Sequence, residues 1–114
     1  MDKLEKLKSI GCNVDEGLNR CLNNQDFYLR LLIKAMDDNK IETLKNAILN
    51  NNLKEAFEIS HSLKGVYANL ALTPIYNIIY ELTEYLRKEE KMDYSSIIND
   101  LIIKYNDIKN IIKD

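Results

Sequence analysis

Residues 56–72 read AFEISHSLKGVYANLAL, and they hold the only histidine of the chain, His61. The 3.6-residue period of a helix sorts this stretch into two sides. One side is apolar except for a serine and a tyrosine, and it comprises Leu53, Ala56, Ile59, Ser60, Leu63, Val66, Tyr67 and Leu70. The opposite side comprises Phe57, His61, Lys64, Gly65 and Ala68. The pattern predicts a helix over about 53–70 that buries the first side and exposes His61.

Two neighbours of His61 are unusual for a helix surface. Gly65 stands one turn after the histidine, where glycine costs roughly 1 kcal/mol relative to alanine. A helical side chain leans back over the preceding turn, so a larger residue at position 65 would cover the imidazole. Lys64 can bring an ammonium beside the ring. A lone histidine on a helix is most often an ordinary surface residue, but an uncovered imidazole beside a cation is suited to accept a phosphoryl group.

The segment HSLKG at 61–65, followed by ANL at 68–70, resembles the H-x-L-K-G signature of histidine-containing phosphotransfer (HPt) domains of two-component phosphorelays. The resemblance extends to the following segment, where the family carries an apolar stripe at the positions of Ile75, Ile78, Ile79 and Leu82. Residues 11–18 resemble the segment that commonly opens such domains, and residues 28–32 resemble the family's Y-x-x-L-L segment. Many members have a small residue at the place of Val66, a glycine at Ala71 and an acidic residue at Thr83.

The resemblance implies a role in signal transduction in which a receiver domain, with its own Mg²⁺, carries an aspartyl phosphate. His61 would attack that phosphorus, become a phosphohistidine and pass the group to another receiver. Lys64 would balance the phosphoryl charge, and Gly65 would give steric access. Phe57 and Ala68 are the expected docking residues, although Phe57 could equally pack on a neighbouring helix. The expected partners are response-regulator receivers and a hybrid histidine kinase, and no cofactor is expected on this chain.

Two other interpretations remain open at this point. The chain could be a helical adaptor that binds a receiver or kinase without accepting phosphate. It could also be an unrelated bundle in which the motif arose by chance, and a buried His61 would favour that interpretation.

Composition excludes several other classes of function. The 114 residues suffice for one domain with a single core. A net charge of −2 offers no basic field for nucleic acid. No apolar run approaches the roughly 20 residues of a membrane span, and the N-terminus MDKLEKLKSI is not a signal peptide. We therefore expect a monomeric, cytoplasmic protein.

The counts of glycine, cysteine and histidine limit the chemistry further. Three glycines cannot form a Gly-rich phosphate loop, so we expect a phosphocarrier without an ATP site rather than an enzyme. Cys12 and Cys21 should lie roughly 13 Å apart along one helix, whereas a disulfide needs Cα atoms within about 7 Å. Two free, buried thiols are expected, and no zinc site.

Helical periodicity recurs along the whole chain, so we predict an all-α fold. The predicted helices span about 2–10, 13–22, 26–36 with a continuation to 50, 53–70, 74–90 and 94–112. Whether 26–50 forms one helix or two stays open. Thr73 is predicted as the N-cap before Pro74, and Asn24 and Asp93 are further cap candidates. These elements predict an antiparallel four-helix bundle core with one or two short additional N-terminal helices.

Overall fold

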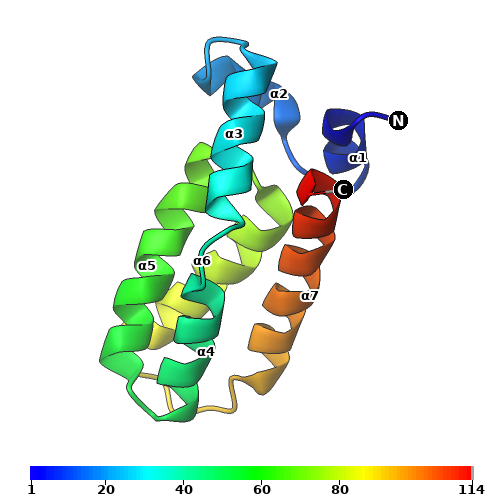
Figure 1. Cartoon of the computed structure of the whole chain (residues 1–114). Coiled ribbons are helices and arrows are strands. Elements are labelled where there is room, and N and C mark those ends of the chain that lie inside the picture. Colours follow the sequence, from blue (N-terminus) through cyan, green and yellow to red (C-terminus); the bar gives the residue numbers. More distant parts are fainter. Residues whose placement is uncertain (114) are drawn as a thin grey trace.

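The computed structural model describes residues 1–113, which form seven α-helices and no strand (Figure 1). The helices are α1 (Lys3–Ser9), α2 (Val14–Arg20), α3 (Gln25–Ala35), α4 (Lys40–Leu49), α5 (Leu53–Asn69), α6 (Thr73–Arg87) and α7 (Ser95–Lys113). The predicted all-α class is therefore confirmed.

Four columns of helix make up the bundle, and the molecule as a whole measures 42 × 23 × 20 Å. Helices α3 and α4 follow one another along one column, and α5, α6 and α7 form the other three with alternating direction (Figure 1). Helix α5 packs on α4 and α6, and α7 packs on α6 and α3. The short helices α1 and α2 lie at the end where α5 finishes and α6 begins. This is the predicted four-helix core with two additional N-terminal helices.

The question left open at 26–50 is settled as two helices, with a break at residues 36–39. The break is tied to α7 at two points. The Tyr105 hydroxyl donates to the Met36 carbonyl oxygen at 3.1 Å, and Lys113 Nζ lies 2.5 Å from the Asp37 carboxylate. The first contact supplies a buried partner to a carbonyl at a helix end, where backbone groups lack partners within the helix.

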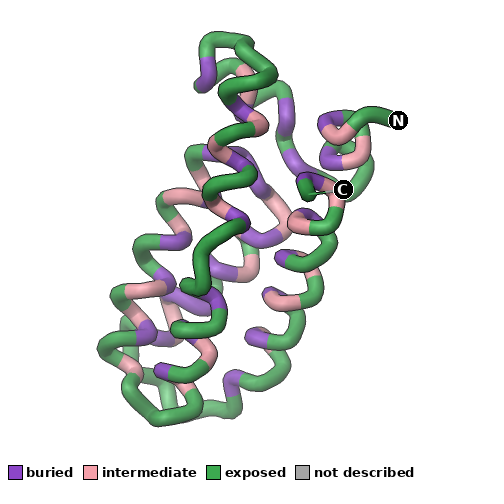
Figure 2. The backbone as a smooth tube through the Cα atoms, viewed as in Figure 1, coloured by how far each residue is buried: buried purple, intermediate pink, exposed green. Residues whose placement is uncertain are grey.

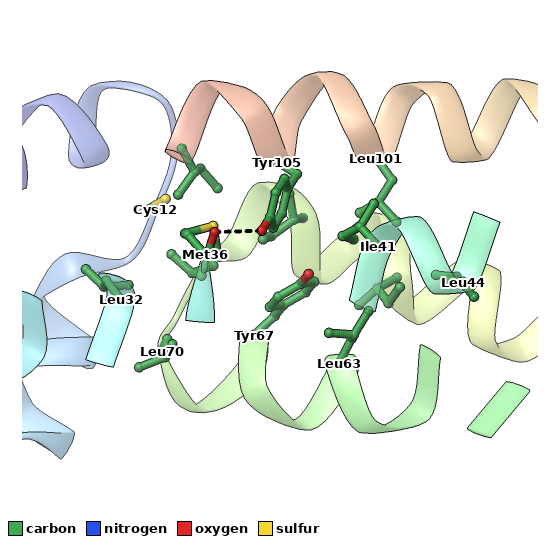
Figure 3. Packing of buried hydrophobic residues seen from close by; sticks show 14 of the residues in the cluster. Cys12, Leu32, Met36, Ile41, Leu44, Leu63, Tyr67, Leu70, Leu101 and Tyr105 are labelled. Atoms are coloured by element: carbon green, nitrogen blue, oxygen red, sulfur yellow. Dashed lines mark hydrogen bonds between the residues drawn. The ribbon is translucent and has the colours of Figure 1, made fainter. Parts of the chain in front are cut away.

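The core runs the length of the bundle between the four columns (Figure 2). On α5 the buried residues are Ala56, Ser60, Leu63 and Tyr67, all from the predicted apolar side. Ser60 Oγ donates to the Phe57 carbonyl oxygen at 3.0 Å, so the buried hydroxyl is satisfied within its own helix. Figure 3 shows Leu63 and Tyr67 of α5 among side chains from the other columns, including Ile41 and Tyr105. Packing of this buried face against the other columns therefore sets which side of α5 remains at the surface.

Helices α2 and α3 hold the end of α5 and the turn that follows it. The Tyr28 hydroxyl donates to the Leu70 carbonyl oxygen at 2.7 Å, and Arg20 Nη1 donates to the Ala68 carbonyl oxygen at 3.0 Å. Ala71 in this turn has a φ of 57°, a conformation that glycine adopts at less cost. The family that the sequence resembles often has glycine at this position.

The helix ends agree with the predicted caps at some points and differ at others. Asn24 Oδ1 accepts from the Phe27 amide at 3.0 Å, as expected of an N-cap. Asp93 Oδ1 accepts from the Ser95 amide at 2.9 Å. The prediction for Thr73 was wrong, because α6 begins at Thr73 and its cap residue is Leu72. Proline is tolerated throughout the first helical turn, where amides lack partners within the helix, so Pro74 did not fix the start.

Two further predictions concern the thiols and the membrane. Cys12 and Cys21 are both free and buried, as expected. Among residues 1–113 we find no helix with the length and apolar character needed to cross a membrane.

Candidate functional site

His61 lies near the middle of α5 and is exposed. The residues on either side of it, Ser60 and Ser62, are buried and exposed respectively, so the boundary between core and surface passes through this turn. The predicted exposure of His61 is confirmed. A buried histidine, which would have favoured a chance occurrence of the motif, is not observed.

Phe57, one turn before His61, stacks against the histidine ring. The two ring centroids are 5.7 Å apart and the ring planes differ by 21°. The guanidinium carbon of Arg87, from α6, lies 4.9 Å from the Phe57 centroid. Phe57 is half-buried, so its ring both packs within the protein and contributes to the surface beside His61.

Lys64, just under one turn after His61, reaches toward α6. Its Nζ lies 5.3 Å from the centroid of the Tyr80 ring, a distance at which cation and ring attract each other. Tyr80 is itself 48% exposed, so the ammonium rests at the surface. The sequence indicated that Lys64 could approach the imidazole, and the structure places its ammonium over Tyr80.

The two cation–aromatic pairs share one register between the antiparallel helices α5 and α6. Phe57 pairs with Arg87, and Lys64 pairs with Tyr80. The members of each helix are two turns apart, with His61 between them on α5. One pair has its aromatic ring on α5 and the other has it on α6. His61 is therefore flanked on both sides by links from α5 to α6.

Gly65 is exposed, and its missing side chain leaves open space. A Cβ built there would meet no heavy atom within 4 Å among the described residues, the backbone of its own helix and its chain neighbours aside. Packing therefore does not require glycine at this position. A larger side chain at this position would project into that open space.

Ala68 is half-buried at the next turn and lines a shallow hollow of about 290 Å³. Arg20 of α2 and Tyr76 of α6 also line this hollow. The hollow therefore begins at Ala68, just under one turn after Gly65.

Residues of α6 were the part of the site that sequence reasoning missed. None of Tyr80, Glu84 and Arg87 was selected from the sequence. Glu84 Oε2 accepts from Arg87 Nε at 3.3 Å, whereas Thr83 is buried and donates to the Ile79 carbonyl oxygen at 2.6 Å. A signal did exist, because Tyr80, Glu84 and Arg87 follow the helical period on the side of α6 away from its apolar stripe.

The groups with strongly raised pKa lie in the core rather than beside His61. Burial raises the pKa of Cys12 to about 11 and that of Tyr105 to about 12. No group of three or more side chains suited to hold a metal ion occurs among residues 1–113. Around the exposed His61, the nearby cations are Lys64 of α5 and Arg87 of α6.

A family model described as Hpt domain matches residues 28–111, from α3 to near the end of α7. Residues 11–18, which resemble the opening segment of such domains, lie outside the matched range. No curated protein and no solved structure matched the chain.

Proposed function

The chain belongs to the Hpt domain family, which implies phosphotransfer in two-component systems, and we propose that it is a phosphorelay intermediate. His61 accepts a phosphoryl group from the aspartyl phosphate of a receiver domain and passes it to the aspartate of another receiver. The observation that carries the proposal is the exposed His61 in the middle of an ordered helix, beside a glycine that no packing contact requires.

The transfer step is an in-line displacement. A ring nitrogen of neutral His61, which we take to be Nε2, forms the new N–P bond. The P–O bond to the donor aspartate breaks, and the aspartate leaves as a carboxylate. Imidazole suits this role because it is a nucleophile that is available unprotonated near neutral pH. The reverse displacement, by the carboxylate of the next receiver, regenerates the free imidazole.

Other residues near His61 assist without reacting. Lys64 lies on the same side of α5, and its ammonium balances charge on the phosphoryl group. Gly65 lets the aspartyl phosphate approach, while Phe57 and Ala68 belong to the surface on which a receiver docks. Phosphoryl transfer depends mainly on positioning and electrostatics. We assign the Mg²⁺ and most of that apparatus to the receiver, so the chain acts as a carrier without an ATP site.

A panel assay against phosphorylated receivers from the same source tests this proposal. We expect at least one receiver to lose its phosphate to the chain within minutes, and the label on the chain to be labile in acid and stable in base. A helical adaptor gives a different result, namely a stable complex with a receiver and no label on the chain. Complex formation without label across the whole panel would overturn the proposal.

A further inference from the structure

The stacked pair of Phe57 and His61 has a feature that docking alone does not require. The ring planes differ by only 21°, so the phenylalanine faces the imidazole rather than merely lying near it. A ring stacked in this way limits rotation of the imidazole about the bond that joins it to Cβ. That rotation decides where each ring nitrogen points.

Phe57 is itself held from α6. The Arg87 guanidinium carbon lies 4.9 Å from the Phe57 centroid, and Arg87 Nε lies 3.3 Å from Glu84 Oε2. The contacts therefore run from Glu84 through Arg87 and Phe57 to His61. Phe57 is half-buried, and it is the residue at which this chain of contacts passes from α6 to α5.

In-line transfer depends on the direction of the attacking nitrogen, because a misplaced nucleophile loses rate steeply. An exposed histidine without a neighbouring ring samples several orientations, and ordering it on contact with the receiver costs conformational entropy. We infer that Phe57 is a positioning residue that fixes the plane of the His61 imidazole, with Arg87 holding Phe57. This inference rests on the proposed function of His61, and it assigns to Phe57 a role in the transfer step itself.

The chain contains a matched control for this inference. Phe27 of α3 also lies under an arginine, with the guanidinium carbon of Arg30 6.0 Å from its ring centroid, and it is 43% exposed. Position 27 is in a different column of the bundle from α5. Phe27→Leu therefore removes the same kind of ring and the same kind of cation–aromatic contact without touching the histidine.

The first test is NMR of the isolated chain, in which the single histidine makes the imidazole signals unambiguous. In the wild type we expect nuclear Overhauser effects between the Phe57 and His61 rings, and ring-current shifts of the imidazole protons. Phe57→Leu should remove these shifts, Phe57→Tyr should restore them, and Phe27→Leu should leave them unchanged. The lack of ring-to-ring effects in the wild type would overturn the inference without any transfer assay.

The second test separates positioning from docking by transfer kinetics over a range of phosphorylated-receiver concentrations. Phe57→Leu keeps an apolar side chain for docking but loses the flat ring. We expect its rate at saturating receiver to fall about tenfold, with the half-saturating concentration nearly unchanged, and Phe57→Tyr to recover most of the rate. Arg87→Met should give a smaller loss of the same kind.

The outcomes distinguish this inference from the proposed function. If the wild type accepts phosphate and Phe57→Leu transfers at the wild-type rate at saturation, the positioning role is wrong while His61 remains the acceptor. A raised half-saturating concentration with an unchanged maximal rate would assign Phe57 to docking alone and overturn the positioning role. If the wild type accepts no phosphate, the proposed function fails, and the NMR comparison still decides whether Phe57 orders the ring.

Discussion

Gly17 and Gly65 both stand inside helices, where glycine costs about 1 kcal/mol relative to alanine, yet their surroundings differ completely. A Cβ at Gly17 would lie 2.5 Å from the Tyr28 hydroxyl oxygen. A Cβ at Gly65 would meet nothing within 4 Å beyond its own helix backbone and chain neighbours, among the residues described. Gly17 is buried where α2 meets Tyr28, and Gly65 is exposed beside His61.

The difference separates a residue needed for folding from one that folding does not need. Without a side chain at position 17, Tyr28 can pack against α2 and donate its hydrogen bond to the Leu70 carbonyl oxygen. At position 65 the helix bears the same cost with no packing contact in return. A residue that lowers helix stability without improving the packing is expected at functional sites. The contrast between the two glycines therefore supports a role for the open surface around His61.

The largest expected effect is that of His61→Gln, which removes the nucleophile from the open surface. Phosphoryl acceptance from any receiver should disappear, while the melting temperature stays within a degree or two, because exposed positions rarely change stability by more than about 0.5 kcal/mol. Labelling and thermal unfolding are measured on the same sample. Undiminished label would move the acceptor elsewhere, and a large drop in melting temperature would show that His61 carries packing after all.

Gly65→Gln should lower transfer by about tenfold or more while the fold becomes equally or more stable. The new side chain leans back over His61 and obstructs the donor, whereas loss of the glycine recovers a few tenths of a kcal/mol up to about 1 kcal/mol. A transfer time course beside a denaturant melt measures both changes. Gly65→Ala is the control, since it recovers the stability with a much smaller obstruction.

Two results would contradict this contrast at Gly65. An unfolded Gly65→Gln would mean that the glycine serves packing, as Gly17 does. Normal transfer by a well-folded Gly65→Gln would mean that His61 does not need the clearance.

Gly17→Ala should have the opposite effects to those expected at position 65, namely lower stability and unchanged transfer. The added methyl group must displace the buried Tyr28 ring, and overpacking of this kind costs roughly 1–3 kcal/mol, which outweighs the helical preference for alanine. We expect a lower free energy of unfolding by denaturant and an unchanged rate of transfer in the fraction that is folded. A variant as stable as the wild type would show that the Tyr28 ring yields, and that the two glycines differ less than their surroundings suggest.

Of the three variants beside His61, Lys64→Ala should have the smallest effect on transfer, a several-fold reduction without loss of acceptance. The ammonium stabilises charge on the phosphoryl group, but the attacking nitrogen belongs to His61. Lys54→Ala, at an exposed lysine near the start of α5, is the control for a general change in charge. Equal rates for wild type and Lys64→Ala would leave Lys64 with only its contact to Tyr80.

Periodicity alone predicted the two sides of α5 because a single helix has fixed geometry. Leu63 and Tyr67 are buried and His61 and Gly65 are exposed, as the 3.6-residue period requires once the apolar side is known. The motif around His61 lies within one helix, so its members share a face whatever the rest of the chain does. This is why the candidate site could be selected from the sequence.

Helical periodicity does not predict which residues of two helices contact each other. Arg87 meets Phe57, and Tyr80 meets Lys64, only because the short turn at 70–72 sets the register of α6 against α5. At the break at 36–39, the Met36 carbonyl likewise has a distant partner, the Tyr105 hydroxyl of α7. The helical period places Tyr80 and Arg87 on the polar side of α6, but it does not give the register of α6 against α5. The pairing of α6 with Phe57 and Lys64, and the choice between one helix and two at 26–50, therefore required the structure.

The central claim is that the exposed face of α5 carries a phosphoacceptor histidine, and NMR of the phosphorylated chain tests it most directly. The chain is incubated with a phosphorylated receiver, purified, and examined by phosphorus NMR together with nitrogen-15 spectra of its only imidazole. We predict one phosphorus signal per chain, bonded to a nitrogen of His61. Phosphate bonded to oxygen on any other side chain, or an imidazole spectrum unchanged by a receiver that has lost its phosphate to the chain, would contradict the account.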